Sequence, residues 1–516
     1  MIPNCKACTF IIILGIFGFC LISFGFGVYF FYSDVKKNFI ASKMNMNKGS
    51  SYIEPWTGLS PIMYDKFYFF NVTNYKEVEE KNAKPKLQEV GPYTFQKFIK
   101  KEIVSQTEDT ITYREKTSYV FHKELSSGDQ NEKIYLINLP VVAVDKVADL
   151  KCPEDMKEIA FSIIDSTLED HKETVFVYKS IDELLFGGYK VEAVGELLDL
   201  ARTFLGEDEV PDVLPNNTFG LYYGKNNTYS KNFTIATGRD NIKDYSNIVS
   251  WDNSKNLAFW NDEYCNQING SDGLEFPPFL KKTETIYVFI EDICRSLYFE
   301  YEKDFFIRKL PVYRFVIPDR LYSAASINED NKCFCSALKS CDVGGITPVG
   351  PCYMDVPIVA SAPHFYQGDS SLLKEVRGLR PNKDQHESFF DIDPVTGTVV
   401  KGVRRLQISA DVRKSENLEL LESISDVVLP VFWISQEYEL SNDDIDYLYW
   451  KIVFPLSIAP VVSLSALILG CTSFFLSIIS WCLLKNVSYF QSIRIKIAKR
   501  SLIKRNSQTG NELKKF

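Results

Sequence analysis

Two long apolar runs stand near the ends of the chain. Residues 7 to 33 contain no charged side chain over 27 positions, and residues 452 to 484 contain none over 33. About 20 apolar residues cross the hydrocarbon core of a bilayer as a helix, so each run is long enough to span a membrane. The first is too long for the apolar core of a signal peptide, and no small-residue cleavage site follows it, so we expect an uncleaved anchor over residues 9–33. Pro455 and Pro460 crowd the start of the second run, which places the predicted span at residues 461–484.

The charges that flank these runs predict the orientation of the chain in the membrane. Residues 485–516 carry nine basic side chains and one acid, a balance of +8. Positive flanks remain in the cytoplasm, so we expect a basic cytoplasmic tail there and, with two spans, a cytoplasmic N-terminal tail over residues 1–8. The first span alone leaves the orientation open, because Lys36 and Lys37 beyond it outnumber Lys6 before it. Subtracting the tail and Lys6 from the total of −9 leaves −18 for residues 34–484, so the predicted ectodomain, residues 34–451, is acidic.

The ectodomain begins with patterns typical of β-strands. An aromatic run from Lys66 to Asn74 predicts a buried strand that ends in a turn. In Glu89 to Phe95 a Gly-Pro pair predicts a turn before a second strand, and Tyr135 to Val144 continues in the same way. These segments predict structural β-strands and contain no candidate catalytic or binding residues.

The apolar period then changes to that of helices. Over residues 156–168 apolar side chains recur three and four positions apart, and Pro153 suits the first turn of a helix. Ser180 and Glu183 have the spacing of a capping box that would open a second, short helix, Ile181 to Phe186. A third pattern follows at residues 191–205. We therefore expect a helical bundle over residues 153–205 within an otherwise β-rich ectodomain.

Cysteines and glycosylation sequons point to an oxidising, extracytoplasmic compartment. Seven cysteines lie between the spans. Six of them form a cluster at residues 265–352, namely Cys265, Cys294, Cys333, Cys335, Cys341 and Cys352, and the seventh is Cys152. The predicted N-glycosylation sites are Asn71, Asn216, Asn226, Asn232 and Asn269. A zinc site would prefer a C-x(2–4)-C spacing and a reducing compartment, so disulfides are favoured, but six cysteines can pair in fifteen ways.

Several motifs in and around this cluster resemble the class B scavenger receptor family. They include Asp292 to Ser296, Pro311 to Pro318 and Asn331 to Cys335, and similar motifs continue from about Trp56 to Trp433. The resemblance implies an α+β fold: two terminal transmembrane helices flank a disulfide-bonded, β-barrel-like ectodomain with an apical helical bundle and an apolar tunnel. It also implies the disulfide pairs Cys265–Cys333, Cys294–Cys352 and Cys335–Cys341. If Cys333 and Cys335 lie on a strand, their side chains point from the same face of that strand and can bond to different partners.

The resemblance further implies a lipid receptor and transporter at the plasma membrane or in the lysosomal or endosomal membrane. Its ligands would be fatty acid, sterol, cholesteryl ester or phospholipid, with a lipoprotein or a lumenal protein as further partners. Docking is expected at the apex, at Glu169, Asp170, His171 and Lys172. Fatty-acid translocases of the family carry lysines there, whereas this chain has an acidic patch that would repel anionic lipoproteins. We therefore expect neutral lipids to compete well against free fatty acids.

The same sequence bears on a pH-sensitive role for the apical histidine and on other classes of protein. His171 can titrate near the pH of endosomes, and the alternative is an ordinary exposed histidine. The chain has four histidines and no G-x-S-x-G, H-E-x-x-H or Walker motif, so we predict no catalytic site, metal, cofactor or nucleic-acid partner. A two-span ion channel is disfavoured because the cysteines gather in one stretch. The alternative function is that of a lysosomal sorting receptor for a lumenal protein, but Leu502-Ile503 in the tail lacks the acidic residues upstream that a sorting signal of this kind carries.

Cysteines at the inner ends of the spans are candidates for palmitoylation. They are Cys5, Cys8 and Cys482, and members of the resembled family carry this modification in such positions. The alternative for Cys482 is an inert thiol within the bilayer.

The basic tail should bind anionic membranes. Residues 494–505 hold six basic side chains, each of which contributes about 1 kcal/mol near an anionic leaflet. We expect a peptide of residues 485–516 to sediment with vesicles that contain phosphatidylserine, and to be released as the salt concentration rises. Vesicles of phosphatidylcholine alone are the control, and binding that salt does not weaken would contradict the electrostatic origin.

Overall fold

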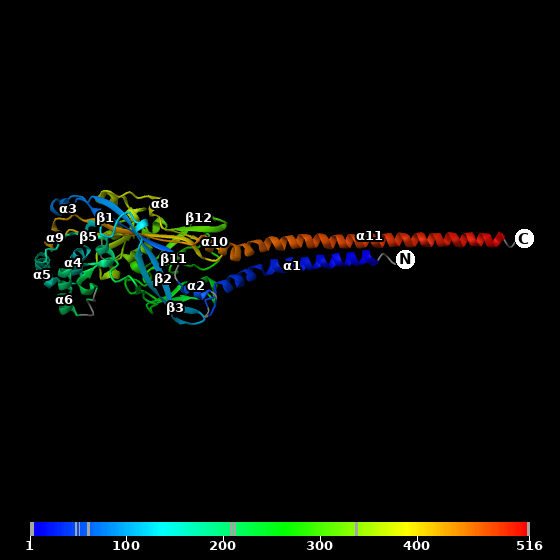
Figure 1. Cartoon of the computed structure of the whole chain (residues 1–516), viewed down its shortest axis with the longest axis horizontal. Coiled ribbons are helices and arrows are strands. Elements are labelled where there is room, and N and C mark those ends of the chain that lie inside the picture. The colour runs from blue at the N-terminus through cyan, green and yellow to red at the C-terminus, as the bar shows by residue number, and fades with distance from the viewer. Residues whose placement is uncertain are drawn as a thin grey trace. The chain divides into compact units, whose positions relative to one another are not determined.

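The computed structural model describes residues 5–46, 49–50, 52–58, 62–206, 210, 213–335 and 339–512. It divides into two compact units, Met1–Ser42 with Tyr447–Phe516, which we call the hairpin, and Lys43–Asp446, which we call the head (Figure 1). The hairpin consists chiefly of α1 (Cys5–Lys43) and α11 (Phe454–Glu512).

One large antiparallel sheet forms the body of the head. Its strand order is β10-β9-β3-β2-β1-β18-β17-β16-β13-β12-β11. In chain order these strands are β1 (Met63–Val72), β2 (Leu87–Gln106), β3 (Thr110–Phe121), β9 (Phe233–Ala236), β10 (Ile248–Trp251), β11 (Ile286–Ile290), β12 (Arg295–Ile307), β13 (Leu310–Val316), β16 (Phe389–Ile392), β17 (Val399–Val412) and β18 (Val427–Glu439). Three short strands join at its margins, namely β8 (Thr228–Tyr229), β14 (Ile346–Pro348) and β15 (Ile358–Ser361).

The two edge strands of this sheet are linked through a short connecting segment. The amide of Ile248 on β10 donates to the carbonyl of Gly270 (2.8 Å), and the amide of Ser271 donates to the carbonyl of Tyr287 on β11 (3.2 Å). Gly270 has a φ of +81°, and a Cβ there would collide with the carbonyl of Tyr287, so this close approach requires glycine. The link satisfies edge groups that would otherwise be open to other chains, and it gives the sheet a barrel-like closure.

Helices and small two-stranded sheets complete the described part of the head. The helices are α2 (Ile53–Thr57), α3 (Tyr75–Lys81), α4 (Leu139–Lys151), α5 (Lys157–Asp170), α6 (Glu192–Leu205), α7 (Ser370–Glu375), α8 (Lys383–His386), α9 (Glu419–Glu422) and α10 (Asn442–Leu448). Strand β4 (Lys133–Ile137) pairs with β5 (Phe176–Ser180), and β6 (Tyr189–Lys190) pairs with β7 (Thr218–Phe219). Helices α4, α5 and α6 pack against one another and are grouped at one side of the head in Figure 1.

The predicted capping box is present. The amide of Ser180 donates to the Glu183 carboxylate (2.8 Å), and the amide of Glu183 donates to the Ser180 hydroxyl (3.2 Å), at the start of a short helical segment that reaches Gly187. This reciprocal pair satisfies two amides that the first turn leaves without partners.

Three local predictions were wrong. Residues 135–144 are not one strand, because β4 stops at Ile137 and Pro140 sits in the first turn of α4, where proline is tolerated. Gly91-Pro92 is not a turn but lies inside β2, at a bulge where a Cβ on Gly91 would approach the carbonyl of Phe67 to 2.6 Å. Cys333 and Cys335 do not lie on a strand, because residues 329–334 form a 3-10 helix.

The structure contains disulfides between Cys265 and Cys333, Cys294 and Cys352, and Cys335 and Cys341, the pairs that the family resemblance implies. Their Cα–Cα distances are 5.9, 6.1 and 5.4 Å, within the range that a disulfide spans. Cys152, at the end of α4, is half-buried and forms no disulfide.

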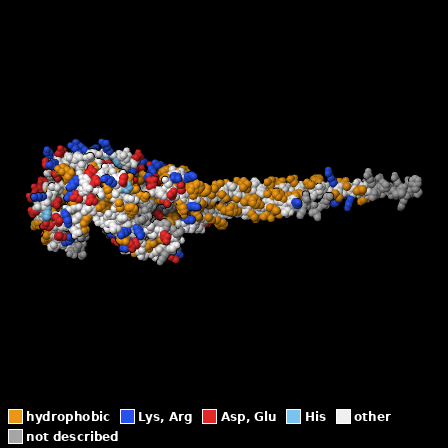
Figure 2. All heavy atoms as spheres, in the orientation of Figure 1, with side chains coloured by type: hydrophobic (Ala, Val, Ile, Leu, Met, Phe, Trp, Pro, Cys, Tyr) orange, Lys and Arg blue, Asp and Glu red, His pale blue; other side chains and the backbone are white. Residues whose placement is uncertain are grey.

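The helices of the hairpin are both long and apolar enough to cross a membrane. They are also longer than predicted: α1 continues past residue 33 to Lys43, and α11 runs through Pro460 without a break and on to Glu512. Figure 2 shows hydrophobic atoms over most of the surface of α1 and of the adjoining part of α11.

Small residues and serines join the two helices in an antiparallel arrangement. Ser477 donates to the carbonyl of Ile11 (2.9 Å), and Ser463 donates to the carbonyl of Gly25 (2.7 Å). A Cβ on Gly18 would lie 2.9 Å from the carbonyl oxygen of Gly470. Small residues allow such close approach of backbones in a membrane, where packing and hydrogen bonds, rather than the hydrophobic effect, hold helices together.

We expect Gly18→Leu to separate the two helices, because the new side chain has no space against the backbone of α11. Overpacking of this kind costs about 1–3 kcal/mol. Heating the purified full chain in detergent and following its monodisperse fraction should show earlier loss for this variant. Gly27→Leu is the matched control, since a Cβ there meets nothing within 4 Å. Equal behaviour of the two variants would contradict the packing.

Candidate functional site

A charged side chain lies among the aromatic core residues of β1. Asp65 is fully buried and shares the core-facing side of the strand with Phe67 and Phe69. One of its carboxylate oxygens, Oδ1, has no hydrogen-bond partner in the described part of the chain. Burial raises the pKa of Asp65, and nearby Lys97 opposes that rise. A buried, incompletely bonded carboxylate is costly in a core and points to a functional position.

Polar residues on the neighbouring strands extend this position into a row across the sheet. Asp65 pairs with Gln436 on β18, which pairs with Arg404 on β17, and paired residues point to one face of a sheet. Gln436 Nε2 donates to Asp65 (3.3 Å), and Arg404 Nε donates to the Gln436 oxygen (2.7 Å). Lys97 on β2 places its Nζ 3.9 Å from Asp65 Oδ2. The terminal Nη groups of Arg404 bond to none of the described residues, so they are available to a ligand.

A second group of polar side chains faces this row. Lys225 Nζ lies 3.0 Å from Asp292 Oδ1, and the hydroxyl of Tyr353 donates to the carbonyl of Asp292 (2.8 Å). Lys225 lowers the pKa of the Asp292 carboxyl, and Arg404 and Lys97 lower it further. Burial raises the pKa of Tyr353 to about 12, although 41% of its surface remains exposed. Protein therefore surrounds this group on most sides while solvent still reaches it. We call these residues and the row together the inner polar cluster.

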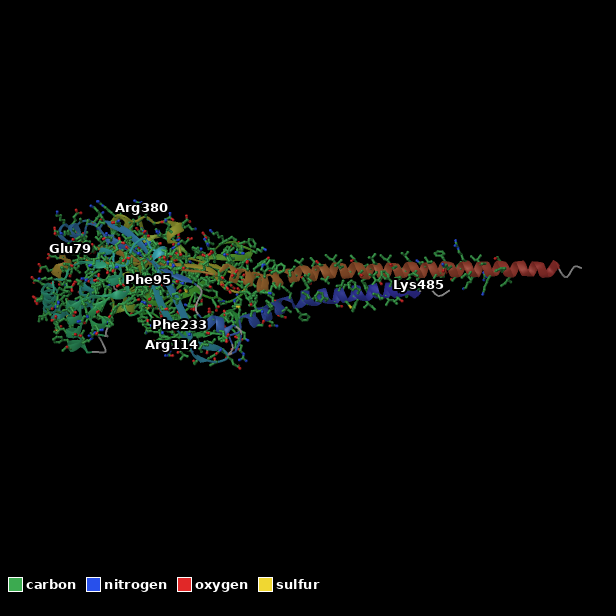
Figure 3. The ribbon with its side chains drawn as sticks, viewed as in Figure 1. Glu79, Phe95, Arg114, Phe233, Arg380 and Lys485 are labelled. Atoms are coloured by element: carbon green, nitrogen blue, oxygen red, sulfur yellow. A yellow bond between two sulfur atoms is a disulfide. The ribbon has the colours of Figure 1, made fainter. Side chains whose placement is uncertain are left out.

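Aromatic rings adjoin the inner polar cluster. The ring of Tyr222 lies 5.1 Å from Lys225 Nζ and 5.0 Å from the ring of Phe67. Phe186 connects Tyr222, at 5.6 Å, with Phe95, at 4.9 Å, and Figure 3 shows Phe95 well inside the head. Charged and apolar surfaces thus meet at one place, as the two parts of an amphipathic molecule require.

The residues predicted for docking lie elsewhere, at the end of α5. Glu169, Asp170, His171 and Lys172 are all exposed. His171 Nε2 lies 3.1 Å from Glu196 Oε2, so this histidine bridges α5 to α6. The structure does not bring these four residues near the inner polar cluster through any contact among the described residues.

Part of the apolar pattern that predicted α5 faces outward. Phe161, Ile164 and Leu168 are buried, whereas Ile159 is 61% exposed. On α6, Phe204 is 69% exposed. These belong to a set of exposed apolar residues on or beside the three packed helices, namely Leu150, Met156, Ile159, Ile163, Leu200, Phe204 and Leu205. An apolar surface of this kind is typical of a binding face.

The predicted glycosylation sites Asn216, Asn226 and Asn269 are exposed, and Asn71 and Asn232 are half-buried. Among the predicted palmitoylation sites, Cys8 is half-buried and Cys482 exposed. Cys5 begins α1, and its side chain lies outside the described residues. Both kinds of modification stay predictions.

The sequence analysis missed the inner polar cluster. One signal was available: in β1, Asp65 falls in phase with Phe67 and Phe69, where an alternating strand calls for an apolar residue. No such signal exists for Lys225, which lies outside helices and strands, or for Asp292, which lies in the 3-10 helix Glu291–Ile293; only the fold brings these segments together.

Two of the four histidines form another buried cluster. The rings of His364 and His386 stack at 4.4 Å, and Glu89 accepts hydrogen bonds from His364 Nε2 (2.5 Å) and Trp433 Nε1 (2.8 Å). Burial alone would raise the pKa of Glu89, but these two bonds hold it below its usual value. Burial, with a smaller effect of His364, lowers the pKa of His386 to about 4.

The fold and the hairpin together define a membrane protein with two terminal candidate spans and a large disulfide-bonded antiparallel head. Residues 16–481 match the model of the CD36 family. The chain is 33% identical to lysosome membrane protein 2 of Rattus norvegicus, over 86% of this chain and 88% of that protein. It is 30% identical to sensory neuron membrane protein 2 of Manduca sexta (78% and 80%) and 28% identical to scavenger receptor class B member 1 of Sus scrofa (90% and 88%). The chain belongs to the CD36 family, whose members include the class B scavenger receptors.

The histidine cluster predicts a loss of stability in acid. The unfolded chain binds a proton at His386 below a pH of about 6.5, whereas the folded chain does so only near pH 4, so stability present at neutral pH falls across this window. The shift corresponds to roughly 3 kcal/mol. Chemical unfolding of wild type and His386→Gln between pH 7 and pH 4 should show a smaller pH-dependent loss for the variant. His122→Gln, at a partly exposed histidine, is the control, and parallel curves for all three proteins would refute the assignment.

Proposed function

We propose that this protein is a lipid receptor and transporter that binds lipid or lipoprotein at the surface of α4, α5 and α6 and passes lipid through an apolar tunnel in the head to the membrane. Membership of the CD36 family supports a general role in lipid reception. The observation that carries the proposal is the inner polar cluster, whose accessible polar groups adjoin the aromatic core. We infer a role in binding and transfer rather than catalysis.

The charges of the inner polar cluster favour a lipid with a zwitterionic head group. Arg404, Lys97 and Lys225 supply cations, while Asp65 and Asp292 supply carboxylates. The Nη groups of Arg404, which bond to none of the described residues, suit a phosphate, because a guanidinium presents paired donors to its oxygens. The acyl chains would lie along the aromatic side, where each methylene removed from water contributes about 0.8 kcal/mol. Phospholipid fits these groups better than sterols and esters do, because sterols and esters would bind through the apolar part alone.

The outer surface of the three packed helices is the proposed docking face. Its exposed apolar residues offer contact area, while Glu169 and Asp170 keep the margin acidic. Such a margin disfavours strongly anionic particles. We place the protein in the plasma membrane or the lysosomal or endosomal membrane, with both termini in the cytoplasm. The antiparallel hairpin supports termini on one side, since the start of α1 contacts the distal part of the apolar stretch of α11.

A lysosomal sorting receptor for a lumenal protein is the second candidate. It is favoured by the identity with lysosome membrane protein 2 and by the same exposed apolar face, which a protein ligand could cover as well as a lipoprotein could.

The proposal is tested by lipid uptake and by binding. The full chain is expressed in cells that lack related receptors, and uptake of labelled phospholipid, fatty acid and cholesteryl ester is measured. Titration of the purified full chain in detergent with the same lipids gives the affinities. We expect Arg404→Gln to weaken phospholipid binding about tenfold, because a charge-assisted hydrogen bond is lost. Binding of cholesteryl ester should be unchanged.

Arg320→Gln is the matched control, because Arg320 pairs with Glu300 on the exposed surface of the head. It should bind every lipid as wild type does. If no lipid binds saturably and none is taken up above background, the transporter function is wrong and the sorting receptor becomes the leading candidate. If lipid binds but Arg404→Gln has no effect, the head-group assignment alone is wrong.

A further inference from the structure

Basic side chains gather on one part of the head, although residues 34–484 carry a net charge of −18. Figure 2 shows Lys and Arg atoms along the margin of the head that carries α3 and α8 in Figure 1, and Figure 3 shows Arg380 on the same margin. A concentration of positive charge on an otherwise acidic surface attracts negatively charged ligands. The exposed residues that we call the basic patch are Lys84, Lys86, Lys374, Arg377 and Arg380.

Backbone contacts between two segments that are far apart in the sequence bring the patch together. Lys86 forms a parallel β-bridge with Arg377, and the amide of Leu87 donates to the carbonyl of Arg377 (2.8 Å). Lys84 Nζ donates to the carbonyl of Lys374 (3.0 Å). The patch is therefore a property of the fold, and neither segment alone contains it.

The alternation of buried and exposed residues turns the lysines of the first segment outward. Pro85 and Leu87 are buried, whereas Lys84 and Lys86 are exposed. Side chains two positions apart in an extended segment lie on one face, about 7 Å from each other. The first segment thus contributes two neighbouring cations, and the second segment contributes three more along its length.

Most of the patch lacks a counter-ion in the described part of the chain. The carboxylate that pairs with a member of it there belongs to Glu77, whose Oε2 lies 3.7 Å from Lys86 Nζ. Both side chains are about half exposed, at 54% and 49%, and a pair of this kind contributes less than about 1 kcal/mol. Glu375, which lies within the second segment, accepts instead from the amide of Val428 (2.9 Å). The protein therefore leaves most of this positive charge to an external ligand.

The surroundings of the patch indicate the kind of ligand. Since each exposed ion pair contributes less than about 1 kcal/mol, a ligand has to engage several cations at once. Among the described residues of 63–103 and 354–446, no large apolar side chain is exposed, whereas the centre of a protein–protein interface is apolar. The disulfides of the head are typical of an extracytoplasmic compartment. A polyanion of that compartment that needs no apolar contact is a sulfated polysaccharide.

We propose that the basic patch is a binding site for a sulfated polysaccharide, which it holds through the sulfate groups. Arg377 and Arg380 present paired N–H donors to sulfate oxygens, and the lysines supply further positive charges. No hydrogen bond or ion pair among the described residues joins the patch to the inner polar cluster. The polysaccharide is thus a second ligand, bound apart from the proposed lipid site.

The test measures the reactivity of individual lysines in the purified full chain in detergent. The chain is acetylated with an amine-directed reagent at increasing concentrations of heparin, and mass spectrometry of its peptides reports each lysine. We expect heparin to protect Lys84, Lys86 and Lys374 saturably, while Lys255, an exposed lysine elsewhere on the head, keeps its reactivity. Heparin from which the sulfate groups have been removed should protect none of them. Because each lysine is measured separately, binding of heparin to the basic tail does not affect the result.

The variant Arg377→Gln removes one cation and leaves the three lysines of the patch as reporters. We expect the heparin concentration that half-protects Lys86 to rise about fivefold, because one charge-assisted contact is lost. Arg320→Gln, which removes another exposed arginine of the head, should leave this concentration unchanged.

The wild-type measurement decides the question even if Arg377→Gln fails to fold. Patch lysines that react like Lys255 at every heparin concentration would overturn the proposal, and so would equal protection by desulfated heparin. Protection by polyglutamate but not by heparin would also overturn it and assign the patch to an acidic protein.

Discussion

The pairing of the first and last long strands of the head is the constraint on which the rest of the structure depends. Strand β1 lies beside β18 in the middle of the sheet, with Met63 opposite Tyr438 and Phe69 opposite Phe432. This contact closes a loop of more than three hundred residues, which is entropically costly, and burial of the Phe67, Phe69 and Phe432 rings repays that cost. Because the pairing is antiparallel, both ends of the head's chain leave at the same side.

The same pairing places charge inside an apolar core. Asp65, Gln436 and Arg404 occupy adjacent strands because of the register, and moving β18 by one residue would turn Gln436 away from Asp65. Polar groups in such a position lower the folding stability of the head relative to that of an apolar core of the same shape. Their retention is understandable if a polar head group completes their hydrogen bonds during function.

Features that depend on residues close together in the sequence could be predicted, whereas features that depend on residues far apart could not. The Ser180–Glu183 capping box is local, and the structure contains it. The strand predicted across Pro140 failed because β-propensity in Val141 and Val142 is weaker than the tertiary contacts that bury them in a helix. The cysteine pairs came from family resemblance, since spacing alone left fifteen possibilities. The inner polar cluster and the serine contacts between the spans join residues far apart in the chain. The period of β1 marks Asp65 as out of place, but it does not identify the residues that Asp65 contacts.

Helix α11 is much longer than a bilayer is thick, so part of it extends beyond the membrane. At 1.5 Å per residue its 59 residues extend roughly 90 Å, about three times the hydrocarbon thickness of a membrane. With the span ending at Leu484, the described basic residues from Arg494 to Arg500 lie on a straight helix, about 15 Å or more along it from the end of the span, which is beyond the screening length of about 8 Å. Only the first turns after the span would then feel the charge of the leaflet. Residues 494–500 therefore hold their cations away from the membrane surface, at a distance that the rise of the helix sets.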